Sequence, residues 1–292
     1  MPKGQSRIST ISCGLPPTTC DEYVPRPAVP GKARDASLEG SPTATKRKGR
    51  QAALAALECE LVNCSRCPRL SAYREHIGRE KRRAYRDWEY WARPVPGFGD
   101  TNARVLILGL APGAHGSNRT GRMFTGDSSG RFLYRVLHTT GFASQPLATG
   151  RDDGMRLLDC YITAALHCVP PGNRPLPAEL ARCAEFLDRE LALLGEVRVV
   201  VVLGRIAFDA YLNYLKRRGK LRRKSGYRFA HGAKYELPDG RILLASYHPS
   251  NQNTQTGKLT EAMLAQVFRT AASLRDMTAT RPQPVRSKMV SS

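Results

Sequence analysis

The sequence has no apolar run of about 18 residues or more, so we expect no segment that crosses a membrane. Residues 1–19 lack the apolar core of a secretory signal peptide, and together these absences predict a cytoplasmic protein. Acidic residues are scarce, 25 against 46 lysines and arginines, which leaves a formal net charge of +21. A surplus of this size indicates a polyanionic partner, and nucleic acid is the partner that we expect.

Several sequence motifs are also missing. There is no GxxxxGK[ST] phosphate loop and no GxGxxG loop, which argues against a nucleotide-binding hydrolase. No HExxH pair is present, which argues against a zinc metallohydrolase. The sequence shows no internal repeat, no heptad pattern and no exposed apolar stripe, and we therefore expect a monomer.

The chain divides into a folded centre and two polar ends. Residues 1–50 are rich in proline, serine, threonine and lysine without an apolar period, which predicts a disordered basic arm. Residues 276–292 are predicted to form a disordered tail. Residues 51–275 hold the periodic segments and form the predicted domain, and the basic surplus extends into them.

Strand-like and helix-like segments alternate through this domain. We expect helices at 51–60, 73–91, 129–139, 177–194, 206–217 and 259–275. We expect strands at 104–110, 161–166, 197–204 and 241–247, and a hairpin flap at 222–237. This alternation predicts an α/β fold with a parallel sheet flanked by helices.

Three unusual loops follow the predicted strands, at 109–127, 167–175 and 248–258. Ligands of parallel sheets bind beyond the carboxyl ends of the strands, so the three loops predict a shared site. The first loop, GLAPGAHGSNRTGRMFTGD, holds five glycines and ends in Asp127. Glycines of this kind let backbone approach a ligand closely.

Four of the eight cysteines form two pairs. Cys64 and Cys67 make a C-x2-C motif, and Cys168 and Cys183 flank the loop VPPGNRPLP. Disulfides are unfavourable in a cytoplasmic protein. A redox pair usually follows a strand, and none is predicted before Cys64. Four thiolates without a histidine suit zinc or an iron–sulfur cluster, and the spacing does not choose between them.

The remaining cysteines receive other interpretations. Cys13 and Cys20 lie in the predicted arm, and Cys160 begins a predicted strand as a buried structural thiol. Cys59 lies close enough to the C-x2-C pair to compete as a ligand.

Three segments together resemble a known family. GLAPGAHGSNRTGRMFTGD, HCVPPGNRPLPAELARC and SYHPSNQNTQTGKLT are similar to the three motifs of the uracil-DNA glycosylase superfamily, closest to its family five, or type B, in the iron–sulfur branch. The resemblance runs from about residue 55 to 275. It implies a three-layer α/β/α sandwich around a four-stranded parallel sheet. It also implies a 4Fe–4S cluster on Cys64, Cys67, Cys168 and Cys183.

The implied activity is a DNA repair reaction that flips out a damaged nucleotide and hydrolyses its N-glycosidic bond. His248 would stabilise the departing base through O2, and Phe124 would stack on it, unless Phe124 only packs in the core. Other branches place an acidic or amide side chain where this chain has Leu110 and Ala111. Asp127 and Asn118 are the polar catalytic candidates in their place, although Asp127 also suits a helix N-cap.

A second departure concerns the choice of base. The iron–sulfur relatives of family four carry an asparagine in a sequence like ITN, and here the sequence reads ITA with Ala164. Losing an amide that reads uracil predicts a broader activity, on uracil and also on hypoxanthine and xanthine. Asn173 is a candidate polar contact, and a turn is its alternative role.

The resemblance also implies contacts to the base and the DNA. The predicted set is Ala111, Pro112, Gly113, His115, Phe124, Asn173, Ser250, Gln252 and Asn253. Gln252 and Asn253 belong to a polar, flexible loop that would fill the gap left by the flipped base. The basic stretches 79–86 and 216–224 either bind phosphates or form solvated charged faces.

Two other functions stay open at this point. A non-catalytic iron–sulfur protein would bind DNA and sense damaged bases without cutting them. A zinc-stabilised RNA-binding protein would also carry the four cysteines and the basic surplus.

Overall fold

The computed structural model describes residues 42–278, so the predictions for residues 1–41 and 279–292 lie outside the described residues. A six-stranded sheet forms the centre, in the order β1-β3-β2-β4-β6-β5. The strands are β1 (Phe98–Gly99), β2 (Val105–Gly109), β3 (Cys160–Ala164), β4 (Val199–Leu203), β5 (Lys234–Glu236) and β6 (Ile242–Ser246).

The four central strands are parallel, as predicted, and every residue in them is buried. Buried valine, isoleucine and leucine runs suit strands covered on both faces. The sheet differs from the four-stranded prediction because β1 and β5 add an antiparallel strand at each edge. The predicted flap at 222–237 is not a hairpin of its own, since its only strand, β5, pairs with β6.

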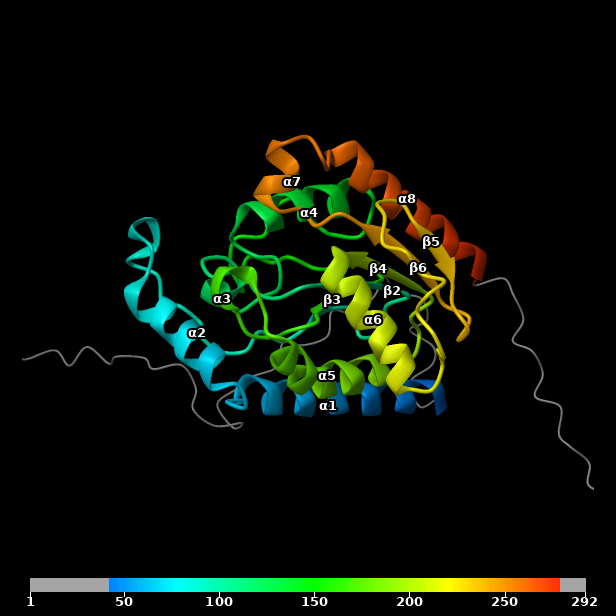
Figure 1. Cartoon of the computed structure of the whole chain (residues 1–292), viewed down its shortest axis with the longest axis horizontal. Coiled ribbons are helices and arrows are strands. Elements are labelled where there is room, and N and C mark those ends of the chain that lie inside the picture. The colour runs from blue at the N-terminus through cyan, green and yellow to red at the C-terminus, as the bar shows by residue number, and fades with distance from the viewer. Residues whose placement is uncertain (1–41, 279–292) are drawn as a thin grey trace, which may run out of the picture.

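Helices cover both faces of the sheet, which confirms the α/β class. They are α1 (Pro42–Val62), α2 (Pro68–Glu80), α3 (Ser117–Thr120), α4 (Ser128–Thr139), α5 (Pro177–Leu193), α6 (Arg205–Arg217), α7 (Asn251–Gln255) and α8 (Glu261–Thr278), with 3-10 turns η1 (Arg83–Tyr85) and η2 (Pro171–Asn173). Figure 1 shows α4 and α8 on one side of the sheet and α5 and α6 on the other, with α1 outside α5. Each side encloses its own apolar core.

Two helices have other bounds than predicted. The helix expected at 51–60 is α1, which begins at Pro42, so residues 42–50 are helical although we assigned them to the arm. Lysine and arginine are good helix formers, and that propensity outweighs the missing apolar period. The helix expected at 73–91 ends at Glu80, because Lys81 adopts a left-handed φ of 47°.

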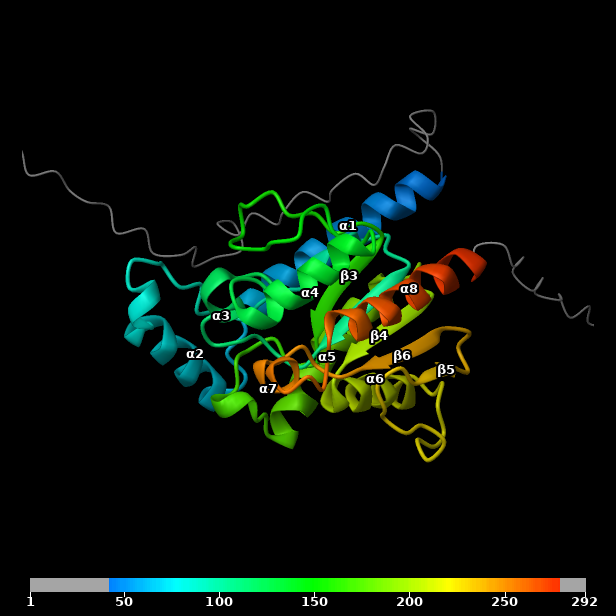
Figure 2. The ribbon, with the colours of Figure 1, turned by 90° about the horizontal axis from the view of Figure 1, so that it is seen from above.

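The three loops of the predicted site do meet at one edge of the sheet. They follow the carboxyl ends of β2, β3 and β6, and they carry α3, η2 and α7. In both views α2 and α3 gather at one end of the molecule (Figures 1 and 2). None of the helices in residues 42–278 has the length and apolarity to cross a membrane.

Candidate active site

Phe124 and His248 meet beyond the carboxyl ends of the strands. Their ring centroids lie 5.8 Å apart, with an interplanar angle of 31°. The Phe124 ring lies against Gly109, the last residue of β2, where an added Cβ would come within 2.9 Å of the ring. Phe124 is buried in the core and has a φ of 52°, which bulky residues avoid and which is typical of functional sites. The glycine and this strained turn together bring the ring to the site.

Asp127 caps helix α4, as one of its two predicted roles required. Its Oδ1 accepts a hydrogen bond of 2.8 Å from the backbone N–H of Gly130. Its Oδ2 lies over the first loop, since a Cβ added to Gly116 would come within 2.0 Å of it. Burial raises the pKa of the Asp127 carboxyl, and the Gly130 N–H opposes this shift. The capping bond fixes the carboxyl group against the loop.

His248 lies two residues beyond β6 and is neutral at pH 7. Burial lowers the pKa of its imidazole to about 4. Its carbonyl accepts a hydrogen bond of 2.8 Å from Nδ2 of Asn253. The loop that we expected to be flexible is the helix α7, capped by Ser250, whose side chain accepts from the N–H of Asn253. Asn253 therefore holds the backbone of His248, while the side chain of Gln252 is exposed.

Other predicted residues lie in different surroundings. Asn118 is fully buried, and its Nδ2 donates to the carbonyl of Arg74 at 3.3 Å. His115 pairs with the Tyr90 hydroxyl at 3.1 Å, and burial lowers the pKa of its imidazole. Asn173 is exposed in a turn with a φ of 57°, the geometry of its alternative role.

Pro112 is buried, and Ala111 and Gly113 are half-buried, in the part of the first loop that directly follows β2 in the chain. The neighbouring Leu110 is also half-buried, and neither it nor Ala111 brings a polar side chain to this position. Asp127 is therefore the carboxylate that the structure fixes against this loop.

Arg119 is a residue of the first loop that the sequence reasoning missed. Its Nε donates to the His115 carbonyl at 2.7 Å, and its Nη2 donates to the Gly126 carbonyl at 2.8 Å. Its guanidinium also lies 3.9 Å from the centroid of the Tyr85 ring and 4.1 Å from that of Trp88. No sequence signal marks it, because its partners are backbone carbonyls and distant rings.

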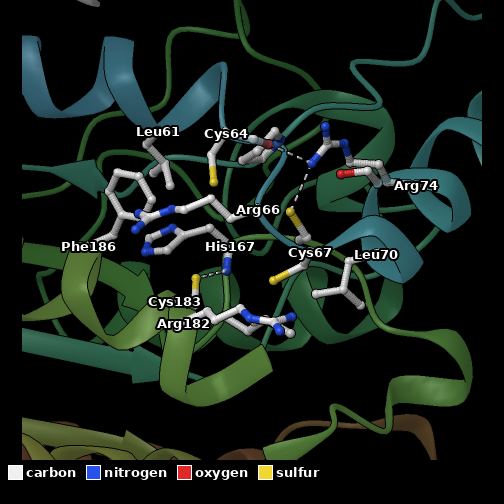
Figure 3. A pocket seen from close by; sticks show the side chains of 14 residues that line it. Leu61, Cys64, Arg66, Cys67, Leu70, Arg74, His167, Arg182, Cys183 and Phe186 are labelled. Carbon is white, nitrogen blue, oxygen red and sulfur yellow. Dashed lines mark hydrogen bonds between the residues drawn. The ribbon is translucent and has the colours of Figure 1, made fainter. Parts of the chain in front are cut away.

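The four paired cysteines line one cavity between α1, α2 and α5. Figure 3 shows Cys64, Cys67 and Cys183 around the same space, and Cys168 completes the lining. Its empty volume, open mouth included, is about 340 Å³. Cys59 is not one of the residues that line it. Burial raises the pKa of the Cys168 thiol to about 11 and also raises that of Cys183.

A few buried polar groups stand among the mostly apolar walls of this cavity. Three buried polar atoms on its walls have no partner in residues 42–278: Oγ of Ser71, Nε of Arg74 and Nε2 of His167. Arg74 also donates to Sγ of Cys168 at 3.2 Å, and the backbone N–H of His167 donates to Sγ of Cys183 at 3.4 Å. In the described chain, no three histidine, cysteine, aspartate or glutamate side chains are placed to hold one metal ion. The hydrogen-bond donors of Ser71, Arg74 and His167 would suit a group bound to all four cysteines.

Comparisons with known proteins agree with these motifs. The family model "Uracil DNA glycosylase superfamily" matches residues 96–272. The chain is 56% identical over 214 residues to the type-5 uracil-DNA glycosylase of Thermus thermophilus, covering 73% of this chain and 94% of that protein. It is 47% identical over 212 residues to the type-5 enzyme of Mycobacterium tuberculosis, covering 72% and 78%. A type-4 uracil-DNA glycosylase of Archaeoglobus fulgidus is 34% identical over 120 residues, 41% of this chain and 52% of that protein.

The family model covers more than half of the chain, and the type-5 relatives are matched over most of their length. The chain therefore belongs to the uracil-DNA glycosylase superfamily, among its type-5 members.

Proposed function

We propose that this protein excises uracil from DNA by hydrolysing the N-glycosidic bond, which leaves an abasic site. The observation that carries the proposal is the neutral His248 imidazole beside the Phe124 ring, at the sheet edge where the family motifs meet. DNA is the proposed partner, in agreement with the net charge of +21. Monomeric state and cytoplasmic location stay predictions of the sequence.

The proposed reaction starts from a nucleotide that has been flipped out of the helix. Phe124 stacks on the base, and an N–H of the neutral His248 donates to O2 of uracil. As the bond from C1′ to N1 breaks, its electron pair passes to the base, and the donor at O2 stabilises the growing negative charge. Water then adds to C1′ and gives its proton to the Asp127 carboxylate, which also faces the developing positive charge of the sugar.

Capping and catalysis by Asp127 are separable by two substitutions. Serine is as good an N-cap as aspartate, so Asp127→Ser keeps the stability of the protein, whereas Asp127→Ala lowers it by about 1 kcal/mol. Both variants lose the carboxylate, and we expect both to excise uracil about 10²-fold more slowly. Thermal unfolding and single-turnover kinetics measure the two effects. If Asp127→Ser excises uracil at the wild-type rate, Asp127 only caps helix α4 and its carboxylate takes no part in the reaction.

We propose a breadth of substrates that includes hypoxanthine and xanthine. Ala164 is the buried last residue of β3 and pairs in register with Gly109, so no amide projects from this position. A pocket without such an amide discriminates weakly between deaminated bases. The test is a comparison of excision rates on duplexes that carry one uracil, hypoxanthine or xanthine. Release of uracil alone, with the purines untouched, contradicts the proposed breadth and leaves uracil excision standing.

We propose that Cys64, Cys67, Cys168 and Cys183 hold a 4Fe–4S cluster. The support is that these four thiols line one cavity, with unpartnered buried donors of Ser71, Arg74 and His167 on its walls. The four cysteines would hold the cluster between the turn that joins α1 to α2, the loop after β3 and helix α5. Arg74 and the His167 N–H stabilise its sulfur ligands.

A further inference from the structure

A basic and aromatic segment lies beside the first loop, residues 109–127. We name it the 82–88 ridge and define it by Arg82, Arg83, Tyr85, Arg86 and Trp88. It follows α2, at the end of the molecule where α3 also lies (Figure 1). The three arginines are exposed, and Trp88 is 41% exposed, unusual for a large apolar side chain.

The 82–88 ridge contacts the first loop through Arg119. Arg119, on α3, places its guanidinium 3.9 Å from the Tyr85 ring centroid and 4.1 Å from that of Trp88. The backbone N–H of Trp91 donates to the Arg119 carbonyl at 2.9 Å, immediately after the ridge. A ligand on the ridge therefore lies at a fixed place relative to the loop that carries Phe124 and Asp127.

The charges of the ridge are available to a ligand. Arg82, Arg83 and Arg86 take part in none of the ion pairs found within residues 42–278. Burial is the main cause of the lowered pKa of His115, and the charge of Arg82 lies close enough to the first loop to lower it further. Two exposed carboxylates, Asp87 and Glu89, also belong to this part of the chain.

We propose that the 82–88 ridge binds the DNA strand that flanks the extruded nucleotide, with its arginines on phosphates and the Trp88 ring against an unpaired base. Aromatic rings among cations are the usual means of binding single-stranded nucleic acid, because every base offers a face for stacking. The inference rests on the proposed function, since it places the ridge next to a flipped nucleotide.

The second basic stretch, 216–224, does not share this role. It begins at the end of α6, and α6 starts directly after β4, so the stretch lies toward the amino ends of the parallel strands. Both views place this end of α6 away from α2 and α3 (Figures 1 and 2). It carries seven basic residues, no acidic residue and no aromatic ring. If charge alone decided, this stretch would bind DNA better than the ridge.

Two matched triple variants test the ridge. The first replaces Arg82, Arg83 and Arg86 with alanine, and the second replaces the equally exposed Arg218, Arg222 and Arg223. The probe is a uracil-free single-stranded oligonucleotide, and its affinity is measured against salt concentration. We expect the ridge variant to lower the slope of log affinity against log salt by about 2, and the second variant to leave it unchanged. Equal losses in both variants would overturn the proposal.

Stacking on Trp88 has its own readout. We expect Trp88→Ala to weaken binding of the same oligonucleotide about tenfold, and Trp88→Phe to restore most of it, because phenylalanine keeps a stacking face. The chain has only two tryptophans, so in a Trp91→Phe background the emission of Trp88 reports the contact directly, as quenching on binding. Unchanged emission and unchanged affinity in Trp88→Ala would refute the stacking contact.

Uracil excision by the wild-type protein is measured in the same series. If the wild type excises uracil while the ridge variants bind DNA normally, the ridge inference fails and the proposed function stands. If the wild type releases no base while the ridge variants lose affinity, the proposed function fails and the ridge remains a DNA surface.

Discussion

We expect His248→Ala to lower the rate of uracil excision by about 10²–10³-fold, the usual loss when one donor to a developing anion is removed. The imidazole is neutral because burial lowers its pKa to about 4, and it contacts Phe124 rather than an acidic partner. In the proposed mechanism its N–H donates to O2 most strongly as the negative charge there grows. We expect the loss in the single-turnover rate constant, with a much smaller change in DNA affinity.

The pH dependence separates His248 from Asp127. Because the pKa of His248 is lowered, its imidazole stays neutral as pH falls from 7 until about 4. The pKa of Asp127 is raised, so its carboxylate takes up a proton at a higher pH than an ordinary aspartate. A fall in rate at a pH above the range of an ordinary aspartate thus reports Asp127, and we expect it to persist in His248→Ala.

The control for His248 is Asn253→Ala, which removes the hydrogen bond to the His248 carbonyl and leaves the ring in place. We expect a loss smaller than that of His248→Ala. If His248→Ala excises uracil at the wild-type rate, the imidazole takes no part in the reaction. A rate that rises as pH falls through 5 would mean that the protonated ring acts instead.

If the four cysteines hold the proposed cluster, we expect Cys168→Ser and Cys183→Ser to abolish iron binding and to destabilise the protein. Binding free energy at such sites is folding free energy, because the unfolded chain has no preformed site. We expect the wild-type protein to be brown and to contain four irons per chain on the 4Fe–4S proposal. Loss of about 3 kcal/mol corresponds to a decrease in Tm of roughly 10 °C for a domain of this size. Iron analysis, visible absorption and thermal unfolding measure these changes.

Cys160→Ala is the matched control for the cysteine site. Cys160 is fully buried in β3 and does not line the cavity. This substitution is expected to cost some stability and to leave the iron content unchanged. Zinc in place of iron in the wild type, or iron retained by Cys168→Ser, would contradict the proposed cluster.

The central sheet was predictable because its four parallel strands are short, continuous runs of mostly apolar residues. VVVVL in β4 is buried on both faces, and its β-branched run has no helical alternative of comparable quality. The edge strands were not predictable, since β1 has two residues and β5 has three, with exposed ends. β1 forms by pairing with β3, and β5 forms by pairing with β6. The local sequence of such short segments does not predict this pairing.

The positions of two candidate residues were predictable from the sequence, while their catalytic roles stay predictions. His248 and Asp127 stand at positions that strand order and loop composition single out. Arg74 and Arg119 were missed because their roles come from distant partners, the sulfur of Cys168 for one and two aromatic rings for the other. Asn253 was placed in a DNA wedge, and the hydrogen bond to His248 gives it a positioning role that the sequence did not suggest.

The most direct test of uracil excision is a product analysis with wild-type protein on a duplex that carries one uracil. Released base is identified by mass spectrometry, and the strand is examined before and after alkali. We predict one free uracil for each alkali-labile site, with the strand intact until alkali is added. DNA that is bound tightly while no base is released would contradict the account and would support a protein that senses damaged bases without excising them.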